Sequence, residues 1–206
     1  MNDFANFLQE NLGEHEPKEI EELILDDLFK DCSEFSEEHK LALEQYSNLI
    51  HLSLNGLGLK TLKNFPCIPN LYILQVKNNK LTGEDFQELL KLYPNLYKLK
   101  LSNNLINSID IFLPLEKSKI KKIEIEKNPV NENNLNYRED LFNIMPNLIT
   151  INREKKDGEI LESTIYNESE NSDEEDYENE EEEEYEEKED ESDEEESFYD
   201  EDEGED

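Results

Sequence analysis

The sequence predicts an α/β solenoid in which short parallel strands stack into a curved sheet that is capped at both ends. Two observations support this fold class: an apolar frame recurs along the first 158 residues, and within each copy the apolar residues alternate as in a strand with one buried face. A third observation concerns charge. From Glu159 onward there are 29 acids and one base, a net charge of 1 − 29 = −28, against 19 − 26 = −7 for residues 1–158. We expect a folded domain over residues 1–157 and a disordered acidic segment over residues 158–206.

The recurring frame has apolar residues at positions 1, 4, 6 and 11 and an asparagine at position 9. Three copies, which begin at Leu71, Leu96 and Ile120, are complete. A copy beginning at Leu49 lacks the asparagine, and a degenerate copy begins at Ile20. The steps between these starts are 29, 22, 25 and 24 residues. Steps of this size are typical of leucine-rich repeats, in which stacked units share one continuous core.

Each copy predicts one strand and one turn. The residues at positions 4 and 6 point inward, and their neighbours point outward onto a concave face. The asparagines Asn79, Asn104 and Asn128 lie where the chain leaves the strand. An asparagine side chain offers both donors and acceptors, so we expect these three to be buried and to bond backbone groups that the turn leaves open.

The segments between strands return on the convex side. Residues 82–85 resemble a helix start, apolar residues follow at helical spacing up to Tyr93, and Pro94 ends the pattern, so residues 82–93 predict a helix. Residues 106–118 contain Pro114, and we expect an irregular return or a short helical turn there.

Both ends of the sheet need covers. At the N-terminus, four apolar residues at helical spacing predict a covering helix: Phe4, Phe7, Leu8 and Leu12. At the other end, Asn136 precedes a helical pattern over residues 137–145 that stops at Pro146. Leu148 and Ile151 then indicate a last strand-like contact.

The C-terminal cap carries a family resemblance. Asn136-Tyr137-Arg138-Glu139 and Pro146-Asn147-Leu148, together with the repeats and the acidic segment, resemble the acidic leucine-rich nuclear phosphoprotein 32 family over roughly residues 18–152. That family's cap usually ends in Leu-Asp, where this chain has Ile151-Asn152. The resemblance implies a non-enzymatic histone-binding chaperone that regulates chromatin and transcription, inhibits histone acetylation, and inhibits a major serine/threonine phosphatase. A leucine-rich spliceosomal protein has the same cap, which leaves an adaptor scaffold as a further alternative.

Catalytic and metal-binding patterns are sparse. His51 and Ser53 lie on one predicted strand and could pair as base and nucleophile, although two exposed polar residues of a binding surface explain them more simply. Cys32 and Cys67 have no metal-ligand spacing and no histidine partner. No glycine-rich phosphate loop or EF-hand occurs. We therefore expect no enzyme, no cofactor and no metal site.

Repeat proteins usually bind partners on the concave face. Alternation places on it Glu22, Ile24, Asp26, His51, Ser53, Asn55, Ile73, Gln75, Lys77, Lys98, Lys100, Ser102, Lys122, Glu124 and Glu126. The lysines fall in the third to fifth repeats. A solvated, mixed face accounts for this pattern most simply. The sharper hypothesis is an anion-docking patch for a partner's acidic segment or for the chain's own. RNA is a third option, disfavoured by the acidic segment and by a lack of clustered aromatics.

The acidic segment predicts a ligand for a very basic protein; a solubilising appendage is the alternative. Full extension at about 3.4 Å per residue gives roughly one net charge per 6 Å, against about one per 1.7 Å in duplex DNA. Such a segment attracts histones without outcompeting DNA, as a chaperone requires. Four aromatic residues within it could anchor on apolar histone surface: Tyr177, Tyr185, Phe198 and Tyr199.

Three serines of the acidic segment precede acids, as acidophilic kinases require: Ser172, Ser192 and Ser197. Each phosphate would add about 1.5 to 2 negative charges. Because the segment already has a net charge of −28, phosphorylation would change the strength of the attraction in small steps and would not turn it on or off.

Location and excluded partners follow from composition. No apolar run approaches the ~18 residues of a membrane span, and the first residues lack the features of a secretory signal. Direct nucleic-acid binding is disfavoured by the net charge of −35. The resemblance implies the nucleus, and we also expect a cytoplasmic pool. The last residues, Asp-Glu-Gly-Glu-Asp, lack the basic cluster that many family members carry, so import by another signal, by small size or with a partner stays open.

Overall fold

The computed structural model describes Phe4, Leu8, residues 15–28 and residues 32–161. The chain divides into two units, Met1–Leu161 and Glu162–Asp206. The second unit lies outside the described residues, and with it the predicted aromatic anchors and phosphorylation sites: Tyr177, Tyr185, Phe198, Tyr199, Ser172, Ser192 and Ser197.

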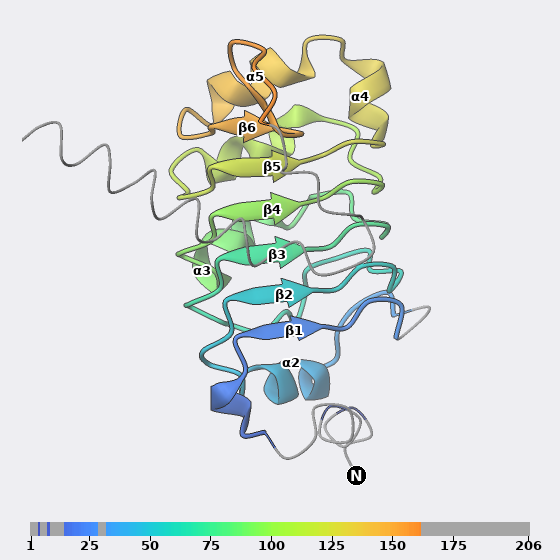
Figure 1. The fold of residues 1–206 in the computed structure, drawn as a ribbon. Helices are drawn as coiled ribbons and strands as arrows, with labels where there is room; N and C mark the ends of the chain where they lie inside the picture. Colours follow the sequence, from blue (N-terminus) through green and yellow to red (C-terminus); the bar gives the residue numbers. More distant parts are fainter. Residues whose placement is uncertain (1–3, 5–7, 9–14, 29–31, 162–206) are drawn as a thin grey trace, which may run out of the picture. The chain divides into compact units, whose positions relative to one another are not determined.

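A seven-stranded sheet forms the described unit, with its strands in sequence order. The strands are β1 (Glu22–Ile24), β2 (His51–Ser53), β3 (Ile73–Gln75), β4 (Lys98–Lys100), β5 (Lys122–Glu124), β6 (Thr150–Ile151) and β7 (Glu154–Lys155). Strands β1 to β6 pair in parallel, and β7 pairs antiparallel to β6. Figure 1 shows the strands stacked one above another along a single axis. The prediction of a leucine-rich-repeat solenoid is confirmed.

The core lies behind the sheet, along the line of the central strand residues. In β1 to β5 these are Leu23, Leu52, Leu74, Leu99 and Ile123, which pair in register and are at most 2% exposed. Stacking in register lets each repeat bury its apolar face against the next.

The first repeat departs from the frame at its last position. Leu28 occupies the frame position that asparagine takes in the complete copies, and it is 47% exposed.

The three frame asparagines form a buried ladder. The Oδ1 atom of Asn79 accepts hydrogen bonds from the backbone N–H groups of Gly58 and Leu59, at 2.9 and 3.0 Å, and its Nδ2 donates to carbonyls of Leu54 and Val76. Asn104 and Asn128 repeat this arrangement one and two turns further along. Each asparagine thus bonds backbone groups of its own turn and of the preceding one, which confirms its predicted role.

In each of the five repeats, the residue directly before position 9 of the frame has a left-handed backbone conformation. This position is occupied by Asp27, Gly56, Asn78, Asn103 and Lys127, with φ between 56° and 71°. A Cβ at Gly56 would lie 2.2 Å from Oδ1 of Asp27, so a larger residue there would require the Asp27 carboxylate to move.

The return between β3 and β4 is helical, as predicted for residues 82–93. It consists of the 3₁₀ turn η2 (Phe86–Glu88) and the short helix α3 (Leu89–Leu92). Asp85 is the N-cap residue of η2, in agreement with a helix start at residues 82–85, but its carboxylate makes no capping bond and instead accepts hydrogen bonds from the Thr61 hydroxyl and the Leu62 N–H. Asp85 therefore ties two successive returns together.

Three further elements occupy the returns and the start of the described region. The 3₁₀ helix η3 (Ile109–Leu115) contains Pro114, in agreement with the short helical turn expected there. The others, η1 (Pro17–Glu19) and α2 (Glu37–Leu43), lie on either side of β1 in the chain. Ser36 and His39 form a reciprocal capping box at the start of α2.

Caps cover both ends of the solenoid. Phe4 and Leu8 belong to the core as expected, while Phe7 and Leu12 lie outside the described residues. Figure 1 shows α2 beside β1, and α4 (Pro129–Asn133) and α5 (Tyr137–Ile144) at the β6 end. The prediction of a C-terminal helix followed by a strand is confirmed.

Arg138 joins this cap to the end of the sheet. Its guanidinium donates to the carbonyls of Ile151, Glu154 and Lys155 at 2.7, 3.3 and 3.2 Å. It also lies 3.2 Å from the Glu154 carboxylate. One side chain thus holds β6 and β7 against α5. Within the described part of the chain, no helix has the length and apolar character that a membrane crossing needs.

Candidate protein-binding surface

The concave face consists of the residues that flank the central residue of each strand. One row runs Glu22, His51, Ile73, Lys98, Lys122, and the next runs Ile24, Ser53, Gln75, Lys100, Glu124. Strands in a sheet are about 4.8 Å apart. Neighbours within a row are therefore close enough for direct contact.

Eight of the ten predicted site residues occupy these rows, and Asn55 and Lys77 lie two residues beyond the ends of β2 and β3. Fewer of the ten are exposed than expected. His51, Ser53, Ile73, Gln75, Lys98 and Lys100 are at most 8% exposed, whereas Asn55, Lys77, Lys122 and Glu124 are partly exposed. Alternation gives the direction of a side chain but not its neighbours. Hydrogen bonds between adjacent repeats contribute to the burial of His51, Ser53 and Gln75.

His51 is the centre of one cross-strand network. Its Nδ1 lies 2.6 Å from Oε1 of Glu22, and its Nε2 lies 2.7 Å from Nε2 of Gln75. A carboxylate can only accept, so Nδ1 carries the proton in this contact. The network links β1, β2 and β3 and fixes the orientation of the imidazole.

Asp26 is the centre of a second network, at the other edge of the same three repeats. Its carboxylate accepts from the Ser53 hydroxyl at 2.7 Å and from the backbone and side-chain amides of Asn55 at 2.8 Å each. Asn55 in turn accepts from the N–H of Lys77 at 2.7 Å. Ser53 is therefore bonded to Asp26 while His51 is bonded to Glu22 and Gln75. These contacts give no support to the nucleophile–base interpretation of His51 and Ser53.

The third to fifth repeats bear the cationic part of the face. Nζ of Lys77 lies 3.3 Å from the Glu124 carboxylate, across the intervening strand. Nζ of Lys122 lies 5.7 Å from the centre of the Tyr97 ring, and that ring stacks on Tyr72 with centroids 4.6 Å apart and an interplanar angle of 9°. A tyrosine pair with a lysine over it suits contacts that combine apolar area with charge.

The tyrosine pair differs from the expectation from sequence, which was that this face has no clustered aromatics. A signal was present, because Tyr72 and Tyr97 both follow a Pro-Asn-Leu triplet and so occupy the same repeat position. Equivalent positions in adjacent repeats lie side by side in a solenoid.

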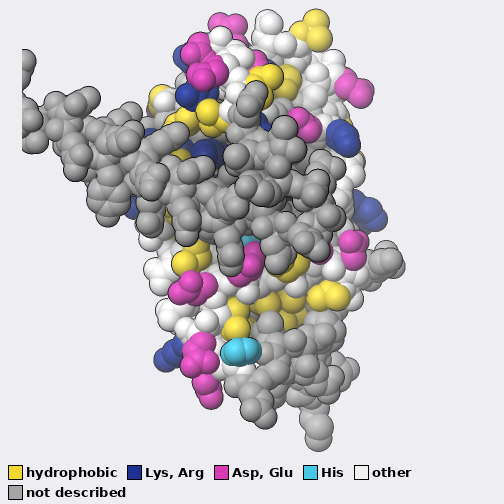
Figure 2. Space-filling model, in the orientation of Figure 1, with side chains coloured by type: hydrophobic (Ala, Val, Ile, Leu, Met, Phe, Trp, Pro, Cys, Tyr) yellow, Lys and Arg dark blue, Asp and Glu magenta, His cyan; other side chains and the backbone are white. Residues whose placement is uncertain are grey.

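The described surface carries charges of both signs. Figure 2 shows acidic and basic side chains interspersed over the described part of the side that displays the sheet. The carboxylates of Glu22 and Asp26 belong to the β1 end, and the lysines belong to β3–β5. Such a face suits a partner with both signs of charge, held in one orientation.

Nucleophilic and metal chemistry gain no support within the described residues. Burial, followed by the charge of Glu34, raises the pKa of the Cys32 thiol, which disfavours the reactive thiolate. Among residues 15–28 and 32–161 no group of three or more histidines, cysteines or acids could hold a metal ion.

Comparison with known proteins identifies relatives. The chain is 32% identical over 154 residues to an acidic leucine-rich nuclear phosphoprotein 32-related protein of Plasmodium falciparum, which covers 73% of this chain and 54% of that protein. It is 28% identical over 124 residues to a Tetrahymena thermophila protein that is named as a histone, covering 60% of this chain and 32% of that one. Proteins of the first family in Drosophila and Caenorhabditis elegans are 27–32% identical. No protein-family model matches.

A solved structure is also similar. A chain in the crystal structure of the Drosophila melanogaster SNF/U2A′ complex superposes with a TM-score of 0.51 at 27% identity, covering 66% of this chain and 74% of that one. The chain spans about half or less of the length of the first curated relatives it matches. The resemblance to the acidic leucine-rich nuclear phosphoprotein 32 family is confirmed by the relatives that carry its name.

Proposed function

We propose that the protein is a nuclear, non-enzymatic histone chaperone and chromatin regulator. In this proposal the acidic segment captures basic proteins, and the concave face of the repeat domain makes a second, oriented protein contact. The relatives are named as leucine-rich proteins of one family, which supports the coarser statement of a leucine-rich-repeat protein. The finer assignment to histones rests on the charges of this chain.

The observation that carries the proposal is the segregation of charge. The 48 residues after Gly158 hold a net charge of −28. A polyanion of this density attracts a cationic protein over distances comparable to the Debye length, about 8–10 Å at physiological salt. Its linear density is about one charge per 6 Å at full extension, below the one per 1.7 Å of duplex DNA. Capture followed by transfer to DNA is therefore energetically accessible.

The relatives' names support the nuclear part of the proposal. Those named after the family are called nuclear phosphoproteins, and these names offer nothing for a cytoplasmic pool. Phosphorylation of Ser172, Ser192 and Ser197 fits the same description and would strengthen the attraction in small steps.

A protein-binding adaptor is the second candidate. The similar solved chain comes from a protein complex, and the concave face here has side chains held in fixed orientations by Glu22–His51–Gln75 and by Asp26. Preorganised polar side chains favour a specific partner over non-specific adhesion. Inhibition of a serine/threonine phosphatase would use the same face, and no feature of the described residues favours that enzyme over another partner.

Binding to core histones across a salt series tests the proposal. The full chain is compared with residues 1–161, which form a unit of their own. We expect tight binding by the full chain that weakens steeply with salt, and loss of binding when residues 162–206 are removed. Equal binding by both chains would assign the contact to the repeat domain and favour the adaptor. Absence of binding by the full chain would reject the chaperone.

A further inference from the structure

We propose that a groove between η3, α4 and α5 binds the guanidinium group of an arginine side chain from a basic partner. The groove has a volume of about 480 Å³. It is formed by elements that connect the strands, so it is separate from the concave face. The inference rests on the proposed function only in that the partner is basic.

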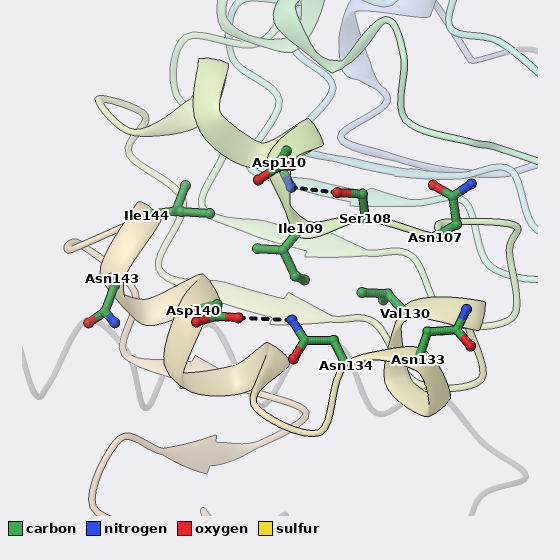
Figure 3. Close-up of a pocket in the computed structure, with 10 residues that line it drawn as sticks. All are labelled: Asn107, Ser108, Ile109, Asp110, Val130, Asn133, Asn134, Asp140, Asn143 and Ile144. Carbon is green, nitrogen blue, oxygen red and sulfur yellow. Dashed lines mark hydrogen bonds between the residues drawn. The ribbon is translucent and has the colours of Figure 1, made fainter.

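The floor of the groove is apolar. Ile109 and Val130 are 5% and 1% exposed, and Ile144 is partly buried against the core. Figure 3 shows the side chains of Ile109 and Val130 between two polar walls. An arginine has three methylene groups before its charged head, and such a stem is stabilised by lying along an apolar surface.

The two walls are each held by a hydrogen bond. On one side the Ser108 hydroxyl accepts from the N–H of Asp110 at 3.1 Å, which caps η3. On the other, Nδ2 of Asn134 donates to Oδ2 of Asp140 at 2.8 Å, and Oδ1 of Asn134 accepts from the N–H of Asn136. The dashed lines in Figure 3 mark the first two of these bonds. Among the described residues, these contacts leave Oδ1 of Asp140 and the carboxylate of Asp110 available as acceptors.

The lining is anionic and rich in acceptors. Its ten residues include two carboxylates and no lysine or arginine. The remaining polar side chains are Ser108 and the amides of Asn107, Asn133, Asn134 and Asn143. This composition repels anions. A metal ion is disfavoured because the described residues contain no group of three acidic, histidine or cysteine side chains that could hold one.

The spread of acceptors distinguishes between cationic ligands. A guanidinium presents five N–H donors in one plane and can bond to both walls at once, whereas an ammonium presents three donors around a point. Carboxylates on opposite walls above an apolar floor therefore fit arginine better than lysine.

Titration with a peptide that contains one arginine among uncharged residues tests the inference. The full chain, labelled with ¹⁵N, is observed by NMR at about 0.3 M salt, where attraction to the acidic segment is largely screened. We expect saturable shifts at residues 107–110 and at 133–134. The citrulline peptide, which keeps the shape and loses the charge, should give none, and the lysine peptide should bind more weakly. Shifts that are equal for citrulline or lysine would overturn the assignment of a guanidinium site.

Substitution localises the site. Asp110→Asn with Asp140→Asn should weaken the arginine peptide at least tenfold, equivalent to about 1.4 kcal/mol. The control, Glu132→Gln with Glu139→Gln, removes the same charge from α4 and α5 outside the groove lining, and should change affinity less than twofold. Equal effects of the two pairs would contradict the inference.

A second probe distinguishes an arginine that belongs to a protein partner from a free small molecule with a guanidinium group. N-acetylarginine amide should bind the groove more weakly than the peptide, and equal or tighter binding would indicate a small-molecule site instead of a protein contact. These measurements are independent of the acidic segment. Loss of histone binding on its removal concerns the proposed function, whereas the response of the groove at high salt concerns this site alone.

Discussion

At the scale of single residues, the concave face is defined by pairing between strands. His51 bonds to Glu22, which is 29 residues away in the sequence, and to Gln75, which is 24 residues away. The repeat frame places these residues in register and so predicts their proximity. It does not predict which polar atoms meet, because that depends on rotamers and on the lengths of neighbouring side chains. The positions of the site were therefore predictable from sequence, whereas its burial and its two networks were not.

The hydroxyl of Tyr93 allows a direct test of what an unpaired polar group in the core costs in stability. Its hydroxyl is buried without a hydrogen-bond partner in the described structure, and burial raises its pKa well above the usual value. Tyr93→Phe removes an unpaired polar group, so we expect the free energy of unfolding to rise by about 1 kcal/mol. Denaturant unfolding measures this change.

The matched control is Tyr137→Phe. The Tyr137 hydroxyl accepts a hydrogen bond from Nδ2 of Asn152 at 3.1 Å, so the same chemical change should lower the free energy of unfolding by about 1 kcal/mol. A loss of stability in both variants would mean that Tyr93 has a partner after all.

At the scale of helices and strands, an element was predictable when the residues that specify it lie within its own stretch of sequence. The helix at the C-terminal cap follows from Asn136 and from the apolar spacing that ends at Met145. Helix α2 was missed because its capping box has His39 where glutamate or glutamine is usual. Strand β7 was missed because a two-residue strand has no periodicity of its own; it depends on Arg138, which bonds its carbonyls from α5.

Removal of the Arg138 contacts should loosen the whole C-terminal cap. For Arg138→Ala we expect a loss of about 2–4 kcal/mol in the free energy of unfolding, since three carbonyl groups and Glu154 lose a charged donor. Hydrogen exchange should show faster opening of residues 150–160. Arg138→Lys keeps the charge but cannot bridge three carbonyls, and should recover only part of the loss. Full recovery by lysine would show that charge alone holds the cap.

The capping box of α2 predicts a dependence on pH. Burial lowers the pKa of His39 below 6.5, and its Nδ1 accepts from the N–H of Ser36 at 3.1 Å, which requires the neutral ring. Because the pKa is lower in the folded state, the unfolded state binds the proton more readily. The stabilisation is present above about pH 6.5 and is lost as pH falls through the folded pKa. In His39→Gln the decline in stability between pH 7 and 5.5 should be smaller. If the decline in stability is the same in His39→Gln, protonation of carboxylates causes it and His39 does not.

The left-handed turn position predicts a stabilising substitution. Lys127 adopts φ 56° where other repeats have asparagine, aspartate or glycine. Lys127→Gly should raise the free energy of unfolding by roughly 1 kcal/mol, because a side chain in this conformation costs energy. Thermal unfolding of this variant beside Lys80→Gly, which removes an exposed lysine from a residue without a positive φ, separates the backbone effect from loss of charge.

At the scale of the whole molecule, the proposed function assigns two kinds of recognition to two parts of one chain. The repeat domain has a net charge near neutrality for its size and holds its concave side chains in fixed contacts. The acidic segment has charge without the apolar residues needed for a core. The family of leucine-rich relatives was predictable from the repeats and from the cap motif around Arg138, because both are local patterns. The partner was not, since a repeat scaffold is compatible with many ligands.

We propose that the acidic segment holds histones strongly enough to prevent non-specific aggregation and weakly enough to release them to DNA. The most direct measurement is transfer of core histones from the full chain to a defined DNA fragment at physiological salt, monitored as nucleosome formation. We predict transfer with less aggregation than in the absence of the protein, and no such effect from residues 1–161. Histones that stay bound to the protein in the presence of DNA, or transfer that is equally efficient without residues 162–206, would contradict a chaperone role of the acidic segment.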